Sequence, residues 1–463
     1  MGRHRSPILV LLVLAAGCGV FELAPKPRLL LLISVDTLRV DRLGVYGSDR
    51  GLTPHIDELG RKSQVFTAAY APTSHTLPSV AALLTGRYPE EIGIWSNYSF
   101  LPDSVPTLAG AFRKDGWHTA AVVSNWVLRA SAGLDAGFEL YDDRFPQLEA
   151  TRPWPERVAG HTTDAALRAL EQCLPDGDGR CFLWVHYEDP HGPYSPPSDW
   201  RERFLPRERE AADGDRELPV LKGPFGTGGI PEYQYLDEQR GVAFYRAGYD
   251  GEIGYLDSEL GRLLEALAER GLLDDAVVVF TADHGEALGE EDYWFSHGES
   301  LSEPLVRVPL LIRVPGREPG TRSDLVSLVD LYPTLTSLLL DRRREPTQSG
   351  RALLADAASS EDSTPYLAAL RGGELPSFGV VEGEFKYVVA PRDGVWHGRL
   401  VQRDDEEVDL TAPAPHVARA MRARLKYLRL RYRRVEHENL REQSEVDREL
   451  LEALGYVQRN QAH

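Results

Sequence analysis

The sequence predicts an α/β fold: a doubly wound, mostly parallel sheet flanked by helices, followed by a small C-terminal α+β subdomain. Two observations carry this prediction. Short continuous apolar runs, the pattern of strands buried on both faces, alternate along the chain with segments of helical periodicity. Several of these runs also end in carboxylate or imidazole residues, at the strand ends where open α/β sheets bind their ligands.

The expected elements follow from these patterns in chain order. The apolar runs predict strands at 29–35, 118–123, 182–187, 276–280 and 308–314. Helical spacing predicts helices at 53–62, 105–115, 162–172, 249–270 and 325–340. Residues 195–241 are rich in Pro, Gly and charge, so we expect a long surface excursion or lid there.

The segment 73–88 is predicted to be a loop that turns into a short helix. Pro78 suits the first helical turn, and Gly86 suits the left-handed residue that ends a helix. Thr76 falls at or just before the helix start, where free N–H groups favour an anion such as phosphate or sulfate. The alternative is that Thr76 serves only as the N-cap of the helix.

Length, charge and the N-terminal segment limit the class of protein. The 463 residues suffice for a large domain with a smaller one, and the net charge of −19 argues against nucleic acid as the main partner. Residues 1–18 are predicted to be a signal peptide, because basic residues precede an apolar run that ends in a lipobox-like sequence at Cys18. Residues 19–27 would form a tether.

We therefore expect an exported protein of the cell envelope or periplasm, held at the membrane as a lipoprotein. An uncleaved anchor is the alternative, and it also exports the chain. In such an oxidising compartment Cys173 and Cys181 are expected to form a disulfide, with a free buried pair as the alternative.

The pattern changes after residue 350, where short strand-like pieces appear at 378–381 and 386–390. Residues 351–463 are expected to form the small C-terminal subdomain. It includes a basic helix at 417–435 with an apolar stripe, which we expect to pack as a core face. Contact of this helix with a membrane surface or lipid headgroups is the alternative.

Three of the predicted strands end in residues that can bind a metal. Asp36 follows the first strand, His191 lies just after another beside Asp189, and the pair Asp283-His284 follows a third. These residues would gather along one edge of the sheet. Oxygen ligands with an imidazole suit Ca²⁺, Mn²⁺ or Zn²⁺. Each residue alone could instead be a satisfied polar group at a strand end.

At these motifs the chain resembles the sulfatase family of the alkaline phosphatase superfamily, over residues 29–457. Ser-Val-Asp-Thr-Leu-Arg at 34–39 is similar to the family's opening metal-binding strand, and the Pro-Ser and Leu-Thr-Gly-Arg-Tyr-Pro motifs within 78–89 fit the frame of the sulfatase signature. Asp-Pro-His-Gly-Pro-Tyr at 189–194 resembles the histidine loop, and the Asp-His-Gly-Glu segment resembles the second metal-binding motif. Leu-Gly-Tyr-Val at 454–457 resembles the end of many bacterial members.

The resemblance implies an alkaline phosphatase-like catalytic domain at 28–350 that binds one divalent cation, with Ca²⁺ the most typical. Family positions place the metal between Asp36, Asp283, His284 and Thr76, with Thr76 at the nucleophile position. The metal would lower the pKa of the nucleophile and neutralise charge on the transferred group.

The resemblance also implies roles for the histidines. His191 and His297 fall where family members contact the sulfate oxygens or protonate the leaving group. Asp189 either orients His191 or has no catalytic part. His186 lies within a strand, so we expect a structural role for it.

The chain departs from the family at several positions. Sulfatases carry a cysteine or serine where this chain has Thr76, and that residue is oxidised to formylglycine. Val80 stands in place of an arginine, Asn125-Trp126-Val127 in place of Lys-Trp-His, and Thr37 in place of an acidic ligand. Formylglycine chemistry is therefore not expected.

We expect a metal-dependent hydrolase of sulfate or phosphate esters, and three interpretations of the function remain open. In the first interpretation Thr76 is itself the nucleophile and forms a phosphothreonine intermediate, as in phosphodiesterases and phosphoethanolamine-type transferases of the superfamily. In the second interpretation the substrate is a sulfate ester, and a metal-bound water attacks it. In the third interpretation the protein is a non-catalytic relative that binds an anionic glycan or lipid. The expected partner is a sulfated or phosphorylated small molecule, glycan or lipid headgroup.

Overall fold

The computed structural model describes residues 27–149, 155–174, 179–340, 348–354, 364–369, 376–392 and 395–433. The predicted signal peptide, nearly all of the tether and the motif at 454–457 lie outside the described residues. Within the described residues, no helix has the length and apolar character needed to cross a membrane.

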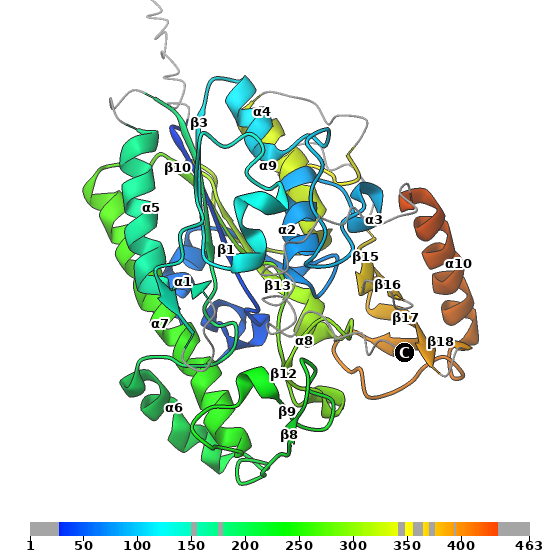
Figure 1. Cartoon of the computed structure of the whole chain (residues 1–463). Helices are drawn as coiled ribbons and strands as arrows, with labels where there is room; N and C mark the ends of the chain where they lie inside the picture. Colours follow the sequence, from blue (N-terminus) through cyan, green and yellow to red (C-terminus); the bar gives the residue numbers. More distant parts are fainter. Residues whose placement is uncertain are drawn as a thin grey trace, which may run out of the picture.

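A central eight-stranded sheet, in the order β14-β2-β13-β10-β1-β7-β3-β4, forms the core of the molecule (Figure 1). Its strands are β1 (Leu29–Val35), β2 (Gln64–Tyr70), β3 (His118–Val123), β4 (Leu140–Asp142), β7 (Cys181–Tyr187), β10 (Ala276–Ala282), β13 (Arg307–Arg313) and β14 (Gly320–Ser327). All neighbours pair in parallel except β13, which runs antiparallel to both β10 and β2. The expected mostly parallel sheet is therefore confirmed.

The register of the three central strands sets the position of the site. β1 lies between β10 and β7, and Val35 is paired with Ala282 on one side and with Tyr187 on the other. All three strands are completely buried, as their unbroken apolar runs predict. The residues that follow them, which include Asp36 and Asp283, therefore emerge side by side at one edge of the sheet.

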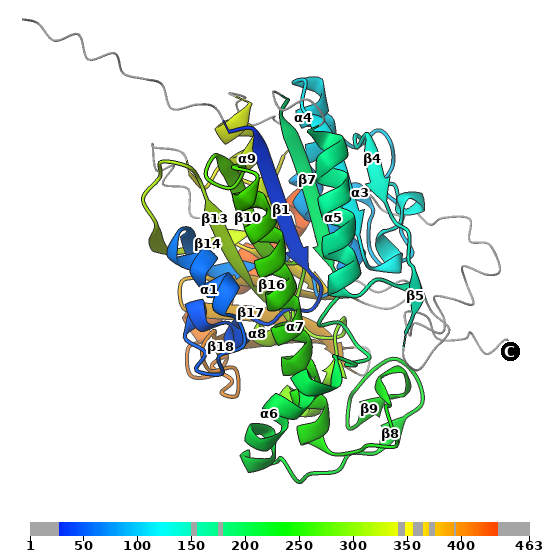
Figure 2. The same ribbon diagram turned by 90° about the vertical axis from the view of Figure 1, so that its left-hand side faces the viewer.

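Helices cover both faces of the sheet, as the doubly wound prediction requires (Figures 1 and 2). One face carries α1 (Pro54–Arg61), α5 (Ala159–Cys173) and α7 (Val242–Glu269); the other carries α2 (Thr76–Thr85), α4 (Leu108–Lys114) and α9 (Leu331–Leu339). Cys173 at the end of α5 forms a disulfide with Cys181 at the start of β7, so the expected bond is confirmed.

Three predictions about elements need correction. The helix expected at 325–340 is shorter, because 325–327 complete strand β14 and α9 starts only after a 3-10 turn at Leu328–Asp330. The long helix α7 starts at Val242, seven residues before the expected position, because its first two turns are also buried. β2 and β14 were not predicted, because partly exposed residues interrupt their apolar character.

The segment 195–241 is more regular than its composition indicates. It contains α6 (Ser198–Glu210), which packs on α7, and two short strands, β8 (Val220–Leu221) and β9 (Ile230–Pro231). These elements lie beyond the carboxyl ends of the sheet strands, at the bottom of Figure 1. The shorter elements elsewhere are α3 (Pro89–Ile92), β5 (Gln147–Leu148), β6 (Pro155–Glu156), β11 (Ala287–Leu288), β12 (Trp294–Ser296) and α8 (Glu303–Val306).

The C-terminal part forms a second, antiparallel sheet covered by one helix. The sheet has the order β15-β16-β17-β18, formed by Tyr366–Ala369, Ser377–Glu382, Phe385–Arg392 and Val395–Gln402. Helix α10 (Pro415–Tyr432) lies on this sheet. The apolar stripe of α10 is buried, which confirms the expected core face; its members are Met421, Leu425, Leu428 and Tyr432.

Candidate active site

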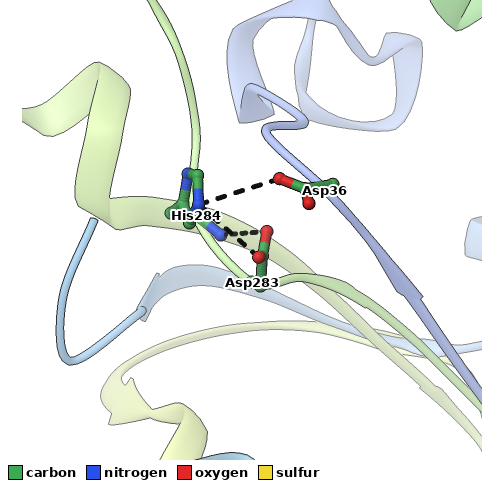
Figure 3. Close-up of side chains that lie close together, drawn as sticks. All are labelled: Asp36, Asp283 and His284. Atoms are coloured by element: carbon green, nitrogen blue, oxygen red, sulfur yellow. Dashed lines mark hydrogen bonds and ion pairs between the residues drawn. The ribbon is translucent and has the colours of Figure 1, made fainter. Parts of the chain in front are cut away.

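Asp36, Asp283 and His284 meet at the edge where β1 and β10 end (Figure 3). Each offers one potential ligand atom, and these atoms lie within 4.8 Å of one another. All three side chains are fully buried. The convergence follows from the parallel register of β1 with β10, which brings residues distant in sequence to the same height.

The imidazole of His284 is oriented so that Nε2 faces the centre of this group. Nδ1 lies 2.9 Å from the carbonyl oxygen of Gly285, so Nδ1 carries the hydrogen and donates it there. Nε2 then presents its lone pair, 3.7 Å from Asp36 Oδ1 and 3.5 Å from Asp283 Oδ2. A backbone carbonyl on the far nitrogen is a common support for a metal-binding histidine.

Thr76 completes the group from the N-terminus of α2. Its Oγ1 lies 3.2 Å from His284 Nε2. The helix begins at Thr76 and His75 occupies the N-cap position, so the interpretation of Thr76 as only an N-cap is wrong. The Ser79 hydroxyl, one turn along α2, donates to the carbonyl of Asp283 at 2.6 Å and fixes the helix start against the end of β10.

A buried network holds the Asp36 carboxylate in place. Asn125 donates from Nδ2 to Asp36 Oδ2 at 2.7 Å, and His186 Nε2 lies 3.6 Å from the same oxygen. His186 Nδ1 is in turn 2.8 Å from the hydroxyl of Ser34, which accepts a hydrogen bond from Trp184. With Oδ2 occupied in this way, Oδ1 is the atom that faces the centre of the site.

The backbone of Thr37 has an unusual conformation that directs its N–H to Asp283. Thr37 has φ of 54°, a left-handed conformation that is rare for a β-branched residue and common at functional sites. Its N–H donates to Asp283 Oδ1 at 3.2 Å, and its carbonyl accepts from the Tyr249 hydroxyl at 2.6 Å. The N–H of His284 donates to the same Asp283 oxygen at 2.7 Å. Oδ2 of Asp283 therefore stays directed at the centre.

The donor set fits a divalent cation. The two carboxylate oxygens that face the centre, Asp36 Oδ1 and Asp283 Oδ2, are buried and have no hydrogen-bond partner among the described residues. Burial, followed by the negative charge of Asp36, raises the pKa of Asp283 well above its usual value. Burial would also raise the pKa of Asp36, but the contact with His186 and the charges of His191 and His284 hold it below its usual value. A cation at the centre would relieve this repulsion and satisfy both oxygens.

His191 and His297 lie next to the metal-ligand group. The ring centroid of His297 is 4.6 Å from that of His284 and 5.2 Å from that of His191. His297 Nδ1 is 3.1 Å from Glu286 Oε1, which fixes the ring. Burial raises the pKa of Glu286 to about 7, and burial, with the nearby His284, lowers that of His297 to about 3. His297 therefore lies between His284 and His191 in this row of rings, held by Glu286.

Asp189 is turned toward α7. Burial raises the pKa of Asp189 to about 7, and burial together with the charge of Asp189 raises the pKa of Glu252. The two carboxyls thus interact inside the protein, and their repulsion disfavours ionisation of both at once. This placement favours a structural role for Asp189 in the loop that carries His191.

Neutral side chains occupy positions at which the chain departs from the family pattern. Val80 lies in the hydrophobic core, as does Val127. Asn125 binds Asp36. A cationic side chain is nevertheless used nearby as a brace: Arg39, which follows β1, donates to the carbonyl of Glu286 at 3.1 Å and pairs with Glu290 at 2.7 Å.

Sequence reasoning did not assign a role to Asn97. Its Oδ1 accepts from the N–H of Leu77, the residue after Thr76, at 2.9 Å. It lies in a loop 20 residues after Leu77, and no periodicity or motif marks it. His186 was expected to be structural, but the fold places it beside Asp36. The parallel pairing of β7 with β1 brings His186 next to the end of β1, and the sequence alone does not show this pairing.

Comparisons with known proteins match this architecture. A family model described as Sulfatase matches residues 28–341. The chain is 28% identical to human iduronate 2-sulfatase over 387 residues, which cover 66% of this chain and 68% of that protein. It is 26% identical to choline-sulfatase of Rhizobium meliloti (strain 1021) over 413 residues, with 80% and 79% covered.

Solved structures show the same fold. The phosphonate monoester hydrolase of Agrobacterium radiobacter superposes with a TM-score of 0.69 at 21% identity, covering 88% of this chain and 96% of that one. A protein solved with its substrate D-glucosamine-2-N,6-O-disulfate gives a TM-score of 0.73 at 17% identity, covering 89% and 99%. At these identities the likeness shows the alkaline phosphatase-like fold.

Proposed function

Because the chain belongs to the sulfatase family, we propose that it hydrolyses phosphate or sulfate esters at one divalent cation, with Thr76 as the nucleophile. Its class, a sulfuric or phosphoric ester hydrolase of sulfatase type, follows from that membership. The residue at the nucleophile position sets it apart from members that use formylglycine. Among the three interpretations from the sequence, we favour attack by threonine on a phosphate ester.

The contact between Thr76 and His284 carries this proposal. The Thr76 hydroxyl is buried at the start of α2, within 3.2 Å of the imidazole nitrogen that faces the two carboxylates. A threonine that only capped the helix would turn its oxygen to the amides of its own first turn. Here the oxygen is turned to the proposed metal ligands instead.

Asp36, Asp283, His284 and Thr76 would hold the cation. A bound divalent cation would lower the pKa of the threonine hydroxyl and offset negative charge on the transferred group. The oxygen-rich set favours Ca²⁺ or Mn²⁺, and the single imidazole also admits Zn²⁺.

The reaction balances with residues of this chain. Oγ of Thr76 loses its proton and bonds to phosphorus, the ester P–O bond breaks, and its electrons leave on the alcohol oxygen. In this proposal His191 and His297, whose rings neighbour each other and that of His284, would take the threonine proton and deliver one to that oxygen. Water then hydrolyses the phosphothreonine, which releases phosphate and restores the hydroxyl.

The positive end of the α2 dipole would attract the non-bridging oxygens of the substrate. α2 presents its positive dipole end to the site, and the chain lacks the arginine and the lysine-histidine pair of the family at Val80 and at 125–127. A site with fewer cationic groups makes the cation and the helix dipole the main sources of charge stabilisation. We expect a substrate that carries one small anionic ester group.

The proposal is tested by turnover of four esters with purified chain loaded with Ca²⁺, Mn²⁺ or Zn²⁺. The substrates are an aryl sulfate, a phosphate monoester, a phosphodiester and a phosphonate monoester. Phosphorus-ester turnover that disappears in Thr76→Ala supports threonine attack. Sulfate-ester turnover that survives Thr76→Ala indicates attack by water instead. Binding of anions without turnover of any ester, with any of the metals, indicates a non-catalytic relative.

A further inference from the structure

Helix α10 has a charge opposite to that of the chain that carries it. It contains five arginines and one lysine, and no aspartate or glutamate. The whole chain has a net charge of −19. In Figure 1, α10 (red) lies at an outer edge of the molecule, on the sheet β15–β18 and away from the central sheet. A basic surface element is thus displayed on an acidic protein.

The basic side chains of α10 face solvent. While the apolar stripe of the helix packs on β15–β18, Arg419, Arg422, Lys426 and Arg431 are exposed. Within the described part of the chain, none of these four has an ion-pair partner. The other two basic residues have partners of their own: Arg429 stacks on Phe378 and Arg424 bonds to Thr364. Among the described residues these four cations therefore form no ion pair, and Arg431 lies 5.6 Å from the ring of Tyr432.

Large apolar side chains are exposed beside these cations. On α10, Tyr427 is 52% exposed and Leu430 is 73% exposed. Val395 and Trp396 at the start of β18 are also exposed, and Arg429 connects the two elements, since its guanidinium lies 5.8 Å from the Trp396 ring. We call these eight residues the basic apolar patch, namely Arg419, Arg422, Lys426, Arg431, Tyr427, Leu430, Val395 and Trp396.

We propose that the basic apolar patch docks the protein on an anionic lipid surface. Arginine and lysine side chains gain attraction from acidic headgroups, while tryptophan, tyrosine and leucine are stabilised at the boundary between headgroups and acyl chains. A polyanionic glycan would satisfy the cations but would leave Leu430 and Trp396 in water. The combination of both residue classes on one edge therefore favours a membrane.

This docking would orient the protein independently of any N-terminal anchor. An anchor at Cys18 would hold the chain near a membrane, but a tether fixes no orientation. Contact through α10 would place one defined edge of the molecule against the lipid. The inference concerns a surface away from Asp36, Thr76 and His284, so it stands or falls separately from the proposed catalysis.

A fluorescent probe at Leu430 tests the proposal with the full chain. The probe is an environment-sensitive dye on Leu430→Cys in a Cys18→Ser background. Phosphatidylcholine vesicles are compared with vesicles that also contain phosphatidylglycerol. We expect a blue shift of emission with the anionic vesicles only, which high salt reverses. The triple variant Arg419→Glu, Arg422→Glu, Lys426→Glu should weaken this response by on the order of 100-fold in vesicle concentration.

Two matched controls make the result specific to the patch. The same dye on Leu148→Cys, an exposed leucine in β5, should show no shift. A triple charge reversal of Lys114, Arg168 and Arg203, exposed basic residues on other helices, should leave the Leu430 response unchanged.

The proposal is overturned if the Leu430 probe does not shift although the anionic vesicles bind the chain, because capture then occurs elsewhere. It is also overturned if both charge-reversal variants weaken the response equally. A shift with dextran sulfate but with no vesicle would assign the patch to polyanionic glycans instead.

Discussion

The hydroxyl oxygen of Thr76 lies 3.2 Å from Nε2 of His284, a residue 208 positions further along the chain. The imidazole nitrogen of this pair also faces Asp36 and Asp283, so the hydroxyl belongs to the proposed metal-ligand group rather than to the cap of its helix. The first prediction tests this relationship.

Serine should partly replace Thr76, whereas valine should not. Serine keeps the hydroxyl and valine keeps the branched shape, so the pair separates chemistry from packing. We expect Thr76→Val to lower kcat by about 10³-fold or more and Thr76→Ser to retain measurable turnover. Steady-state kinetics on the best ester from the substrate panel measure this. Equal activity of the valine variant and the unaltered chain would remove Thr76 from the mechanism.

Divalent cations should stabilise the protein through Asp283. At a concentration about a hundredfold above the dissociation constant, a bound metal adds about 3 kcal/mol to the free energy of unfolding. Asp283→Asn keeps the oxygen that accepts from Thr37 and His284 but replaces the one that faces the centre. We expect the metal-dependent rise in Tm to disappear in this variant.

The metal-free Asp283→Asn variant should be at least as stable as the unaltered chain, because the repulsion with Asp36 is gone. Thermal unfolding with and without Ca²⁺, Mn²⁺ or Zn²⁺ measures both effects. Asp199→Asn, an exposed change on α6, is the control and should behave as the unaltered chain. A metal response that persists in Asp283→Asn would place the cation elsewhere.

Loss of the Asn125 side chain should weaken metal binding without removing a ligand. Asn125 occupies one oxygen of Asp36 and so directs the other to the centre. Removal of such supporting hydrogen bonds lowers metal affinity by about 10- to 100-fold, which we expect for Asn125→Ala by isothermal titration calorimetry. Asp199→Asn, an exposed change on α6, is the control and should not change the affinity. Equal losses in the two variants would indicate a general effect on folding.

His191→Gln should slow esters with poor leaving groups most. If His191 delivers the proton to the leaving oxygen, an alkyl ester should lose about 10²- to 10⁴-fold in kcat. A nitrophenyl ester, whose leaving group needs no proton, should lose far less. Both rates are measured with the same metal and enzyme preparation. A loss of the same size on both esters would mean that His191 binds the anion instead.

The stability of the fold should depend on pH through Asp257. This carboxyl on α7 accepts from the N–H groups of His55 and Ile56 at the start of α1, and burial raises its pKa to about 6 from 3.8. Because the folded chain holds this proton up to a higher pH than the unfolded chain, the contribution of Asp257 to stability falls as pH rises from 3.8 to about 6. The size of this effect is at most about 3 kcal/mol.

Asp257→Asn should remove this slope, since an amide does not titrate over the interval. Urea unfolding across the interval measures the difference between variant and unaltered chain, in which the other carboxyls cancel. Asp199→Asn serves again as the control. A slope unchanged in Asp257→Asn would show that the carboxyl keeps its ordinary pKa in the fold.

The sequence by itself determined five of the eight strands of the central sheet, the sheet class and the ligand-type residues. A continuous apolar run in the local sequence indicates a buried strand, so strand Leu29–Val35 was predicted with its observed bounds. The end of helix α2 was also predictable from the local sequence, because Gly86 ends the helix in the expected left-handed conformation, with φ of 67°. Where exposed residues interrupt a strand, as in β14, the local pattern failed.

Only the tertiary structure decided which side chains share the site and which of their atoms are available. Asn125, His186 and Thr37 surround the two carboxylates because β1, β3, β7 and β10 pair in one register, and no local pattern records that register. The hydrogen bonds that occupy one oxygen of Asp36 and one of Asp283 leave the other oxygen of each facing Thr76 and His284. Residue type and spacing in the sequence indicate which residues are candidate ligands. The long-range packing of the strand ends decides which of their atoms face the centre of the site.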